Sequence, residues 1–308
     1  MTTVALWMIV SQVQAQSPGI EVFRDAQFRH GFQLTAASHP APMVEIGVLE
    51  VGESTSSAPP EWRIAQWGTR TLLEPGCCTR NANGVWIAEN AAKHVEVERA
   101  VNGMTRLWLE VRGAHEYAGK FRATGESWPH LLIEQGFSKP IRPAAAQRMP
   151  FSLDMRVAFC KMTGEPAYKL DPGLHTAQVS AYWTVQDMVS SEHDMIWFGI
   201  PLFDARYDVP PAHYAIDGGK ADASGKFICV LDGKRFWSGS TGDGAWRSLD
   251  LDLIPLLREA LAIAQQQGHL KLAKFEDLAI TSFNLGWEVP GPYDAAIEFR
   301  RLSLKEDK

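Results

Sequence analysis

The chain has 308 residues, of which 45% are apolar, so it is long enough to bury a sizeable core. Its 30 Lys and Arg against 36 Asp and Glu leave a net charge of −6, which argues against binding to a nucleic acid backbone. Eleven Trp, 14 Phe and 6 Tyr beside only 21% charged residues indicate much rigid aromatic surface. Such surface stacks on flat ligand faces, sugar rings among them, as well as filling a core.

The first fifteen residues have the pattern of an export signal. They carry no charge, contain an apolar run from Val4 to Val10 and end in Val13-Gln14-Ala15, which is typical of a signal-peptidase site. We therefore expect residues 1–15 to be a signal peptide and the protein to be secreted or periplasmic. Because a basic start is missing, a truncated leader or a buried first strand is the alternative. No other apolar run reaches the roughly 18 residues that span a membrane.

Alternating apolar and polar residues, separated by Gly, Pro, Asn and Asp clusters, predict a protein made mostly of antiparallel strands. The run Met195–Phe203 is apolar on both faces, which predicts a central strand covered on each side. The expected fold class is an all-β, two-sheet antiparallel β-sandwich (a jelly roll), with residues 16–308 forming a single domain. About ten strands are predicted, at 28–34, 62–67, 104–112, 130–135, 152–159, 176–186, 195–203, 226–231, 278–285 and 296–302.

One helix is predicted in residues 254–268. Pro255 suits a first turn, and Gly268 can end the helix. A buried stripe is formed by Leu256, Leu257, Ala260, Leu261 and Ala264. We expect this helix to cap one end of the sandwich.

A first candidate site lies in residues 125–135. On a strand, His130 and Glu134 share one face and form a possible acid/base pair, with Glu126 and Trp128 just before them. The alternative is a surface-facing His and Glu on an edge strand. On a helix, the two residues would be four apart and could bind zinc, but no second His has the right spacing.

A second candidate site lies in residues 175–186, which His175 begins. One face of this strand carries hydroxyl and amide groups that can bind carbohydrate hydroxyls, or that form an ordinary solvated face. These groups are Gln178, Ser180, Tyr182, Thr184 and Gln186.

A third candidate site follows the apolar strand. Asp204, Arg206 and Tyr207 come directly after it, and His213 follows a Pro-rich turn. Loops that leave rigid strands often carry functional groups. Asp204 and Arg206 can form an ion pair that stiffens the loop, which we favour, or that binds a substrate carboxylate.

The cysteines and acidic residues predict no cofactor. The spacings of zinc sites are absent. A structural Ca²⁺ between Asp217 and Asp222 stays open, although the spacing matches no twelve-residue calcium loop. Cys160 and Cys229 lie in separate strands and are either buried thiols, which we favour slightly, or an inter-strand disulfide.

The whole pattern, with its closing segments AWRSLDLDLIPLL and AAIEFRRLSL, resembles secreted jelly-roll carbohydrate-active proteins of the galactose-binding-like or concanavalin A-like kind. The resemblance is one of architecture. The Glu-x-Asp-x-x-Glu motif of laminarinase-type hydrolases is absent, and LEVRG, HTAQV and HYAIDGG only echo the strands of alginate lyases. No catalytic residue is carried over from either group.

The sequence therefore predicts an exported enzyme that cleaves glycosidic bonds in a polysaccharide or oligosaccharide, in a cleft on the concave sheet. As a glycoside hydrolase it needs two carboxylates, for which the candidates are Glu126, Glu134, Asp204 and Glu288. As a polysaccharide lyase it needs a base (His130 or His175), an acid (Tyr182 or Tyr207) and a group that neutralises a carboxylate (Gln178 or Arg206).

Two alternatives lack chemistry. In a non-catalytic carbohydrate-binding β-sandwich protein, Trp108, Trp128 and Trp183 would stack on sugars. In a structural module, the aromatic residues would all be core. The substrate-binding residues expected of the enzyme are Trp108, Trp128, Gln178, Tyr182, Tyr207 and His213.

Overall fold

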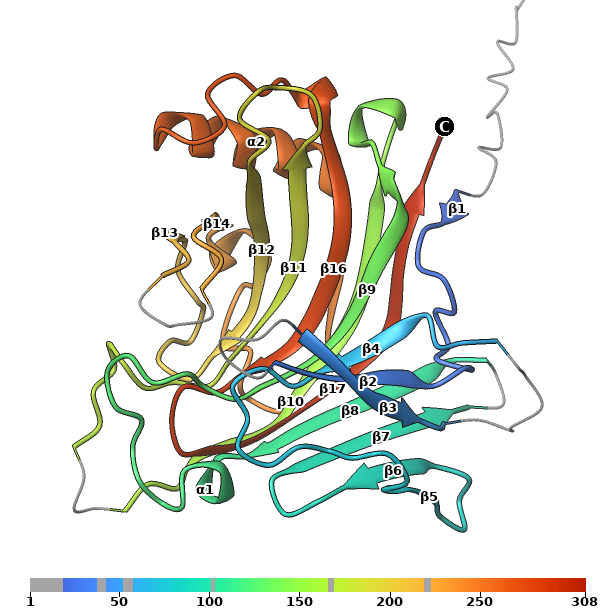
Figure 1. Cartoon of the computed structure of the whole chain (residues 1–308), viewed down its shortest axis with the longest axis vertical. Coiled ribbons are helices and arrows are strands. Elements are labelled where there is room, and N and C mark those ends of the chain that lie inside the picture. Colours follow the sequence, from blue (N-terminus) through green and yellow to red (C-terminus); the bar gives the residue numbers. More distant parts are fainter. Residues whose placement is uncertain (1–18, 38–42, 52–57, 101–102, 166–168, 219–222) are drawn as a thin grey trace, which may run out of the picture.

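The computed structural model describes residues 19–308 apart from 38–42, 52–57, 101–102, 166–168 and 219–222. The chain forms two layers of β-sheet with few helices, so the predicted all-β sandwich is confirmed (Figure 1). The proposed signal peptide and Asp222 lie outside the described residues.

The first layer is an eight-stranded antiparallel sheet. A short strand, β1 (Ile20–Glu21), pairs with β17 outside the main path of this sheet. That path runs in the order β15 (Arg247–Asp252), β10 (Pro150–Met162), β17 (Tyr293–Glu306), β8 (Thr105–Arg112), β7 (Lys93–Arg99), β6 (Trp86–Glu89) and β5 (Cys78–Arg80).

The second layer is a nine-stranded sheet. The pairs β12–β14 and β2–β4 are parallel, so the expectation of antiparallel pairing was wrong for these two pairs alone. The sheet runs in the order β13 (His213–Ile216), β14 (Phe227–Val230), β12 (Met195–Asp204), β11 (Gln178–Asp187), β16 (Leu278–Glu288), β9 (His130–Ile141), β4 (Trp62–Ala65), β2 (Phe32–Ala37) and β3 (Met43–Leu49).

The predicted helix is α2 (Leu253–Gln266), and it buries the expected stripe. The Asp252 side chain accepts a hydrogen bond from the Ile254 N–H at 3.2 Å, which caps the first turn. The helix packs against β12 and β14, near the upper ends of β12 and β11 in Figure 1. The remaining helical segments are α1 (Gly113–Glu116) and three 3₁₀ turns at Pro143–Ala145, Gly233–Arg235 and Phe275–Asp277.

The core lies between the two sheets. Trp183, Phe283 and Trp287 point inward from the nine-stranded sheet and are fully buried. The Trp287 indole N–H donates to the Leu109 carbonyl oxygen at 2.9 Å, which ties β16 to β8 of the other sheet. Since successive side chains of a strand alternate between faces, the residues between these aromatic groups face away from the core.

Several strands escaped the sequence pattern. The predicted strand 28–34 begins only at Phe32, because the chain turns at Asp25 and Phe28, both of which have positive φ. Most of the missed strands are short edge or polar segments without clear alternation, and they are β1, β3, β5, β6, β7, β13 and β15. Of these, β7 does alternate, with Val95 and Val97 facing the core.

Cys160 lies on β10 and Cys229 on β14, in different sheets, and both are free thiols. The favoured sequence interpretation of two buried thiols is confirmed for Cys229, whereas Cys160 is only partly buried, and the inter-strand disulfide was wrong. No helix of the described residues is long and apolar enough to cross a membrane.

Candidate active site

Strand pairing places a row of polar residues across four strands on the outer face of the nine-stranded sheet. His130 on β9 pairs with Glu288 on β16, Glu288 with Gln178 on β11, and Gln178 with Asp204 at the end of β12. Paired residues of neighbouring antiparallel strands share a face. We call His130, Glu288, Gln178 and Asp204 the His130 row.

A second row crosses the same face four residues further along. Arg63 on β4 pairs with Glu134 on β9, Glu134 with Asn284 on β16, and Asn284 with Tyr182 on β11. We call these four residues the Glu134 row. His130 and Glu134 therefore share one face of a strand, as the sequence predicted, and β9 excludes the helical spacing on which the zinc alternative depended.

Three residues of the two rows are shielded from solvent although they face away from the core. The exposed fraction is 3% for His130, 5% for Glu134 and 5% for Asn284. A polar side chain on a fully open sheet face would be far more exposed, so neighbouring groups cover these three side chains. Their burial strengthens the interactions between them and their polar neighbours.

Three side-chain nitrogen atoms lie close to one carboxylate oxygen of Glu288. Its Oε2 accepts a hydrogen bond from the Trp128 indole N–H at 3.2 Å and lies 3.5 Å from Gln178 Nε2. The His130 Nε2 is also 3.5 Å from this oxygen. Donors that converge on one carboxylate oxygen stabilise its ionised form and fix its orientation.

His130 is enclosed by aromatic rings. Trp128 stacks on it with ring centroids 5.9 Å apart, and Trp67 lies 5.5 Å away at a tilt. The Arg122 guanidinium lies over the Trp128 ring at 4.9 Å, and its Nη1 donates to the Glu126 carbonyl oxygen at 2.7 Å. This cation–π contact and hydrogen bond hold Trp128 in place beside Glu288.

Glu134 has a different environment. Its Oε2 lies 3.5 Å from Arg63 Nη2, and this oxygen lacks a hydrogen bond within the described structure. Burial raises the pKa of the Glu134 carboxyl to about 7, and the positive charge of Arg63 opposes this rise only in part. A carboxyl group that keeps its proton near neutral pH can act as a general acid.

Aromatic rings border the rows on the side of β12. Gly199 lies opposite Tyr182, and a Cβ atom there would come within 2.6 Å of the Tyr182 ring, so the glycine lets the ring lie against the sheet. Trp197 meets this ring edge-on at 6.4 Å. Burial, and next the negative charge of Glu288, raise the pKa of Tyr182, which keeps its hydroxyl protonated.

Gly286 lies midway between Asn284 and Glu288 on β16, and it pairs with Leu132 and Ser180. Its φ is +150°, and a Cβ atom there would overlap the Leu131 carbonyl oxygen. β16 therefore contributes no side chain to the row between the two carboxyl groups, to which Leu132 and Ser180 belong.

A buried ion pair anchors the loop that carries Trp67. Lys93 on β7 and Glu116 on α1 form an ion pair whose side chains are both fully buried. Lys93 Nζ donates to the Thr71 carbonyl oxygen at 2.6 Å, and the Arg70 backbone N–H donates to Glu116 Oε2 at 2.7 Å. Burial lowers the pKa of Lys93, and Glu116 opposes this change.

Other residues predicted from sequence are engaged in structural contacts. His175 Nδ1 accepts from the Asp171 N–H at 3.0 Å, and its Nε2 lies 2.9 Å from the Arg122 carbonyl oxygen, so both nitrogens are engaged. Asp204 accepts from Thr176 at 2.7 Å and from Arg206 Nη2 at 2.6 Å. This geometry agrees with the favoured interpretation that Asp204 and Arg206 stiffen a loop; catalytic roles for them and for His175 stay predictions.

Three more predicted residues do not belong to either row. Glu126 forms an ion pair with Arg70 in the loop before β9. Tyr207 is exposed and carries the Arg206 guanidinium over its ring at 5.3 Å. His213 is exposed on the edge strand β13. Their roles in binding or catalysis stay predictions.

The three proposed tryptophan platforms do not lie together. Trp128 borders the His130 row, whereas Trp108 lies on β8 in the other sheet. The ring centroids of Trp108 and Phe159 are 6.4 Å apart. Trp183 is fully buried in the core, so its expected role as a stacking platform was wrong. The cause is the pairing of strands, which the alternation within one strand does not reveal.

Sequence reasoning missed four residues of this region. Arg63 and Trp67 share one face in the segment WRIAQW, and the alternation there could have indicated them. Asn284 and Trp197 lie in strands that were predicted, but strand pairing alone brings them to the rows.

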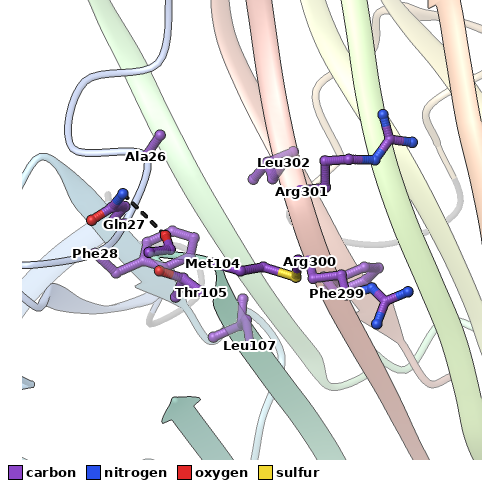
Figure 2. A pocket seen from close by; sticks show the side chains of 11 residues that line it. Ala26, Gln27, Phe28, Met104, Thr105, Leu107, Phe299, Arg300, Arg301 and Leu302 are labelled. Carbon is purple, nitrogen blue, oxygen red and sulfur yellow. Dashed lines mark hydrogen bonds between the residues drawn. The ribbon is translucent and has the colours of Figure 1, made fainter. Parts of the chain in front are cut away.

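A pocket of about 340 Å³ lies elsewhere, beside β8 and β17 (Figure 2). The Arg300 and Arg301 side chains extend away from Gln27 and Phe28 in Figure 2, and both guanidinium groups bind Asp154. The floor of this pocket is apolar and is formed by Phe28, Leu107 and Phe299. The pocket therefore lacks the groups for acid–base chemistry. Among the described residues, no group of three or more His, Cys, Asp and Glu could hold a metal ion.

No family model matches the chain, and no curated protein matches it by sequence. Several solved structures align with it. One is an engineered cellulase derived from that of Rhodothermus marinus, at 12% identity over 74% of this chain and 94% of the other, with a TM-score of 0.39. A family 12 xyloglucanase from Bacillus licheniformis aligns at 11% identity over 76% of this chain and 98% of the other, with a TM-score of 0.38.

A third structure is the xyloglucanase domain of a type three effector from Sinorhizobium fredii, in complex with cellobiose. It aligns at 10% identity over 77% of this chain and 100% of the other, with a TM-score of 0.35. All three are carbohydrate-active proteins, the class that the sequence resembles in architecture. The likeness is too distant to place catalytic residues.

Proposed function

We propose that the protein is a glycoside hydrolase that cleaves a polysaccharide of neutral sugars on the outer face of the nine-stranded sheet. One observation carries this proposal: two carboxyl groups on adjacent strands lie in different environments on the same face of the nine-stranded sheet. Glycoside hydrolysis needs such a pair, one carboxyl protonated and the other ionised.

Glu134 is the general acid in this proposal. Because its pKa is raised to about 7, a large fraction of the carboxyl holds a proton in neutral solution, ready for the leaving oxygen. Glu288 is the carboxylate that activates water or attacks the sugar. The Trp128 N–H at 3.2 Å favours its ionised state.

The charges favour hydrolysis of neutral sugars over elimination from uronic acids. Elimination needs a cation or amide that is available to neutralise the substrate's carboxylate. Arg206 is bound to Asp204, Arg63 to Glu134, and Gln178 faces Glu288. The Glu288 carboxylate on this face would also repel a uronate.

The aromatic rings give the substrate a surface on which to stack. Tyr182 and Trp197 lie at one side of the rows, and Trp67 and Trp128 at the other. The apolar faces of sugar rings bind such groups, while amide and hydroxyl side chains bind the sugar hydroxyls. Gln178, Ser180 and Asn284 lie on this face and are the side chains proposed for this part of recognition.

A second candidate function is binding without chemistry. Glu134 and Glu288 are offset by four residues, so their backbones lie far apart. This separation favours binding without chemistry if no substrate draws the two side chains together. The two functions differ in turnover and not in affinity. A binding protein would keep its affinity for sugar and release no product.

The purified full chain should be incubated with plant and algal polysaccharides while reducing ends and the absorbance of unsaturated products are followed together. We expect reducing ends without absorbance. Glu134→Gln and Glu288→Gln should each lower kcat by at least about 100-fold and preserve binding, since general acid–base groups contribute about 10²- to 10⁴-fold. Glu45→Gln, at an exposed position of β3, is the control.

Absorbance would identify a lyase and contradict the proposal. Binding without either product would favour the second candidate for the substrates tested. Equal turnover by wild type and both variants would show that the two carboxyl groups do not act in catalysis.

We also propose that the protein is exported, on the signal-peptide pattern of residues 1–15. Expression of the whole chain in a secreting host, followed by N-terminal sequencing, tests this. Cleavage after Ala15 is expected, and an intact N-terminus on a protein retained inside the cell would contradict it.

A further inference from the structure

Trp67 borders the outer face of the nine-stranded sheet, in the loop of residues 66–73 that follows β4. We call this segment the Trp67 loop. The pairing of β4 with β9 brings Arg63 opposite Glu134. The same register continues past the strand, because the His130 N–H donates to the Trp67 carbonyl oxygen at 2.8 Å. The Trp67 ring therefore lies beside the His130 row, with its centroid 5.5 Å from that of the His130 ring.

The Trp67 side chain has the properties of a ligand-binding group. Its ring is half-buried, so part of it stays open to solvent. Its indole N–H donates no hydrogen bond to another residue within the described part of the chain. A sugar can stack on such a ring while one of its hydroxyl groups accepts a hydrogen bond from the indole.

Hydrogen bonds fasten the Trp67 loop at several points. Gln66, which is 1% exposed, accepts from the Leu73 N–H at 2.7 Å and donates to the Leu73 carbonyl oxygen at 3.1 Å. Asn90, which directly follows β6, donates to the Leu72 carbonyl oxygen at 2.7 Å. These bonds join the two ends of the loop and tie it to the eight-stranded sheet.

The ion pair of Lys93 and Glu116 holds the middle of this loop. Lys93 Nζ donates to the Thr71 carbonyl oxygen at 2.6 Å, and Glu116 Oε2 accepts from the Arg70 N–H at 2.7 Å. Both charged groups also bind the Thr69 hydroxyl. Because both charged side chains are fully buried, the loop supplies part of the hydrogen bonding that a buried charge requires.

The pair comes from the other side of the sandwich. Lys93 lies on the core-facing side of β7, and Glu116 lies on α1, which follows β8. A buried ion pair is often no more stabilising than apolar residues of similar size, so stability alone gives no reason for two charges here. Apolar residues lack the donor and the acceptor that bind the loop backbone. The two charges thus specify where the Trp67 loop lies.

We propose that Lys93 and Glu116 are positioning residues for ligand binding, which hold the Trp67 loop so that the Trp67 ring meets a sugar beside the His130 row. This inference rests on the proposed binding of a neutral polysaccharide to this face, and it is independent of whether a glycosidic bond is cleaved. A ring that is held in place before binding loses little conformational freedom when the sugar arrives. Without the pair, the ligand has to order the loop, and affinity falls.

The variant that tests the anchor combines Lys93→Met with Glu116→Leu. It leaves no buried charge, so the fold should keep much of its stability, and it removes both bonds to the loop backbone. Hydrogen exchange of the intact protein should show the amides of residues 67–73 exchanging at least about tenfold faster than in the wild type. Arg235→Met with Glu259→Leu removes an exposed ion pair between a 3₁₀ turn and α2, and it is the matched control.

Affinity is measured by calorimetry with xyloglucan, mixed-linkage β-glucan and arabinoxylan, three neutral polysaccharides. Trp67→Ala should raise Kd by about tenfold, and the Lys93 and Glu116 double variant should raise it similarly. Because the pair acts through Trp67, adding Trp67→Ala to the double variant should change Kd by less than about twofold.

Kinetics separate positioning from a loss of folded protein. Removing a contact that substrate and transition state make equally raises KM and leaves kcat unchanged. We therefore expect the double variant to raise KM by about tenfold while kcat stays near that of the wild type. A purely structural role would lower the active fraction, and with it kcat, and would leave KM unchanged.

The outcomes distinguish this inference from the proposed function. Unchanged exchange in residues 67–73, an unchanged Kd in the double variant, or additive effects of the double variant and Trp67→Ala would each overturn the positioning role. If these results are as expected and no polysaccharide is cleaved, the positioning role stands and the hydrolase proposal fails. Hydrolysis with a wild-type KM in the double variant overturns the inference and leaves the proposed function intact. If the wild type binds none of the three polysaccharides, the positioning role for these ligands fails.

Discussion

Glu134 and Glu288 lie on the same face of adjacent strands, with Glu288 opposite His130 and Glu134 four residues further along β9. A strand rises about 3.3 Å per residue and strands lie about 4.8 Å apart, so their Cα atoms are about 14 Å from each other. Between the two rows, β16 carries Gly286, and Leu132 and Ser180 lie beside it on the neighbouring strands.

This spacing predicts hydrolysis with inversion at the anomeric carbon. Retaining enzymes hold their carboxyl groups about 5 to 5.5 Å apart, whereas inverting enzymes separate them by about 6.5 to 9.5 Å to admit water. When the Cα atoms are about 14 Å apart, the two carboxyl groups reach the separation of inverting enzymes more easily than that of retaining enzymes. Proton NMR of the first products identifies their anomer, and retention would contradict the assignment.

The pH dependence of stability should report the burial of Glu134. Its pKa is raised from 4.5 to about 7, so the folded protein holds this proton more tightly than the unfolded chain does. The folded state then loses stability as pH rises from 4.5 to 7, by about 3 kcal/mol at about 1.4 kcal/mol per pKa unit.

Glu134→Gln removes this penalty. We therefore expect the variant to gain about 3 kcal/mol relative to wild type between pH 4.5 and pH 8, measured by urea unfolding. Glu45→Gln, at an exposed position of β3, serves as the control. A difference between wild type and Glu134→Gln that is the same at both pH values would show that Glu134 is not held protonated.

Lys93→Met should destabilise the protein strongly. It leaves the fully buried Glu116 carboxylate without its ion-pair partner, a loss that typically costs about 3 to 5 kcal/mol. The double variant Lys93→Met, Glu116→Leu should recover much of this stability, because no buried charge remains. Denaturant unfolding measures both, with exposed Lys139→Met as the control, and a small effect of the single change would contradict the prediction.

Gly286→Ala should lower stability by more than about 1 kcal/mol. The backbone there has a φ of +150°, and the added Cβ would overlap the Leu131 carbonyl oxygen. Gly136 on the neighbouring strand has nothing within 4 Å of the position of a Cβ, so Gly136→Ala is a matched control. Thermal unfolding compares the two, and equal melting temperatures would show that the strand accommodates the methyl group.

Local sequence patterns were sufficient for part of this region. Alternation along single strands correctly placed His130 with Glu134, and Gln178 with Tyr182, on common faces. The stripe from Leu256 to Ala264 located the helix. These features depend on the periodicity of one element, which neighbouring residues encode.

Contacts between distant segments could not be read in the same way. The sequence does not distinguish Trp108 from Trp128. In the structure, Trp108 lies on the eight-stranded sheet, whereas Trp128 lies beside Glu288. Asp204 lies in register with Gln178, but its carboxylate is occupied by Thr176 and Arg206. Nothing in either strand alone distinguishes these outcomes.

The amino-acid order by itself determined that this protein is built from two-faced strands, because side-chain direction alternates wherever the backbone is extended. Only the tertiary structure decided that β16 lies between β9 and β11 in this register, which brings Glu288 to His130 and Asn284 to Glu134. The physical reason is that register follows from packing two sheets over one core, and a shift of one residue would turn each row to the opposite face.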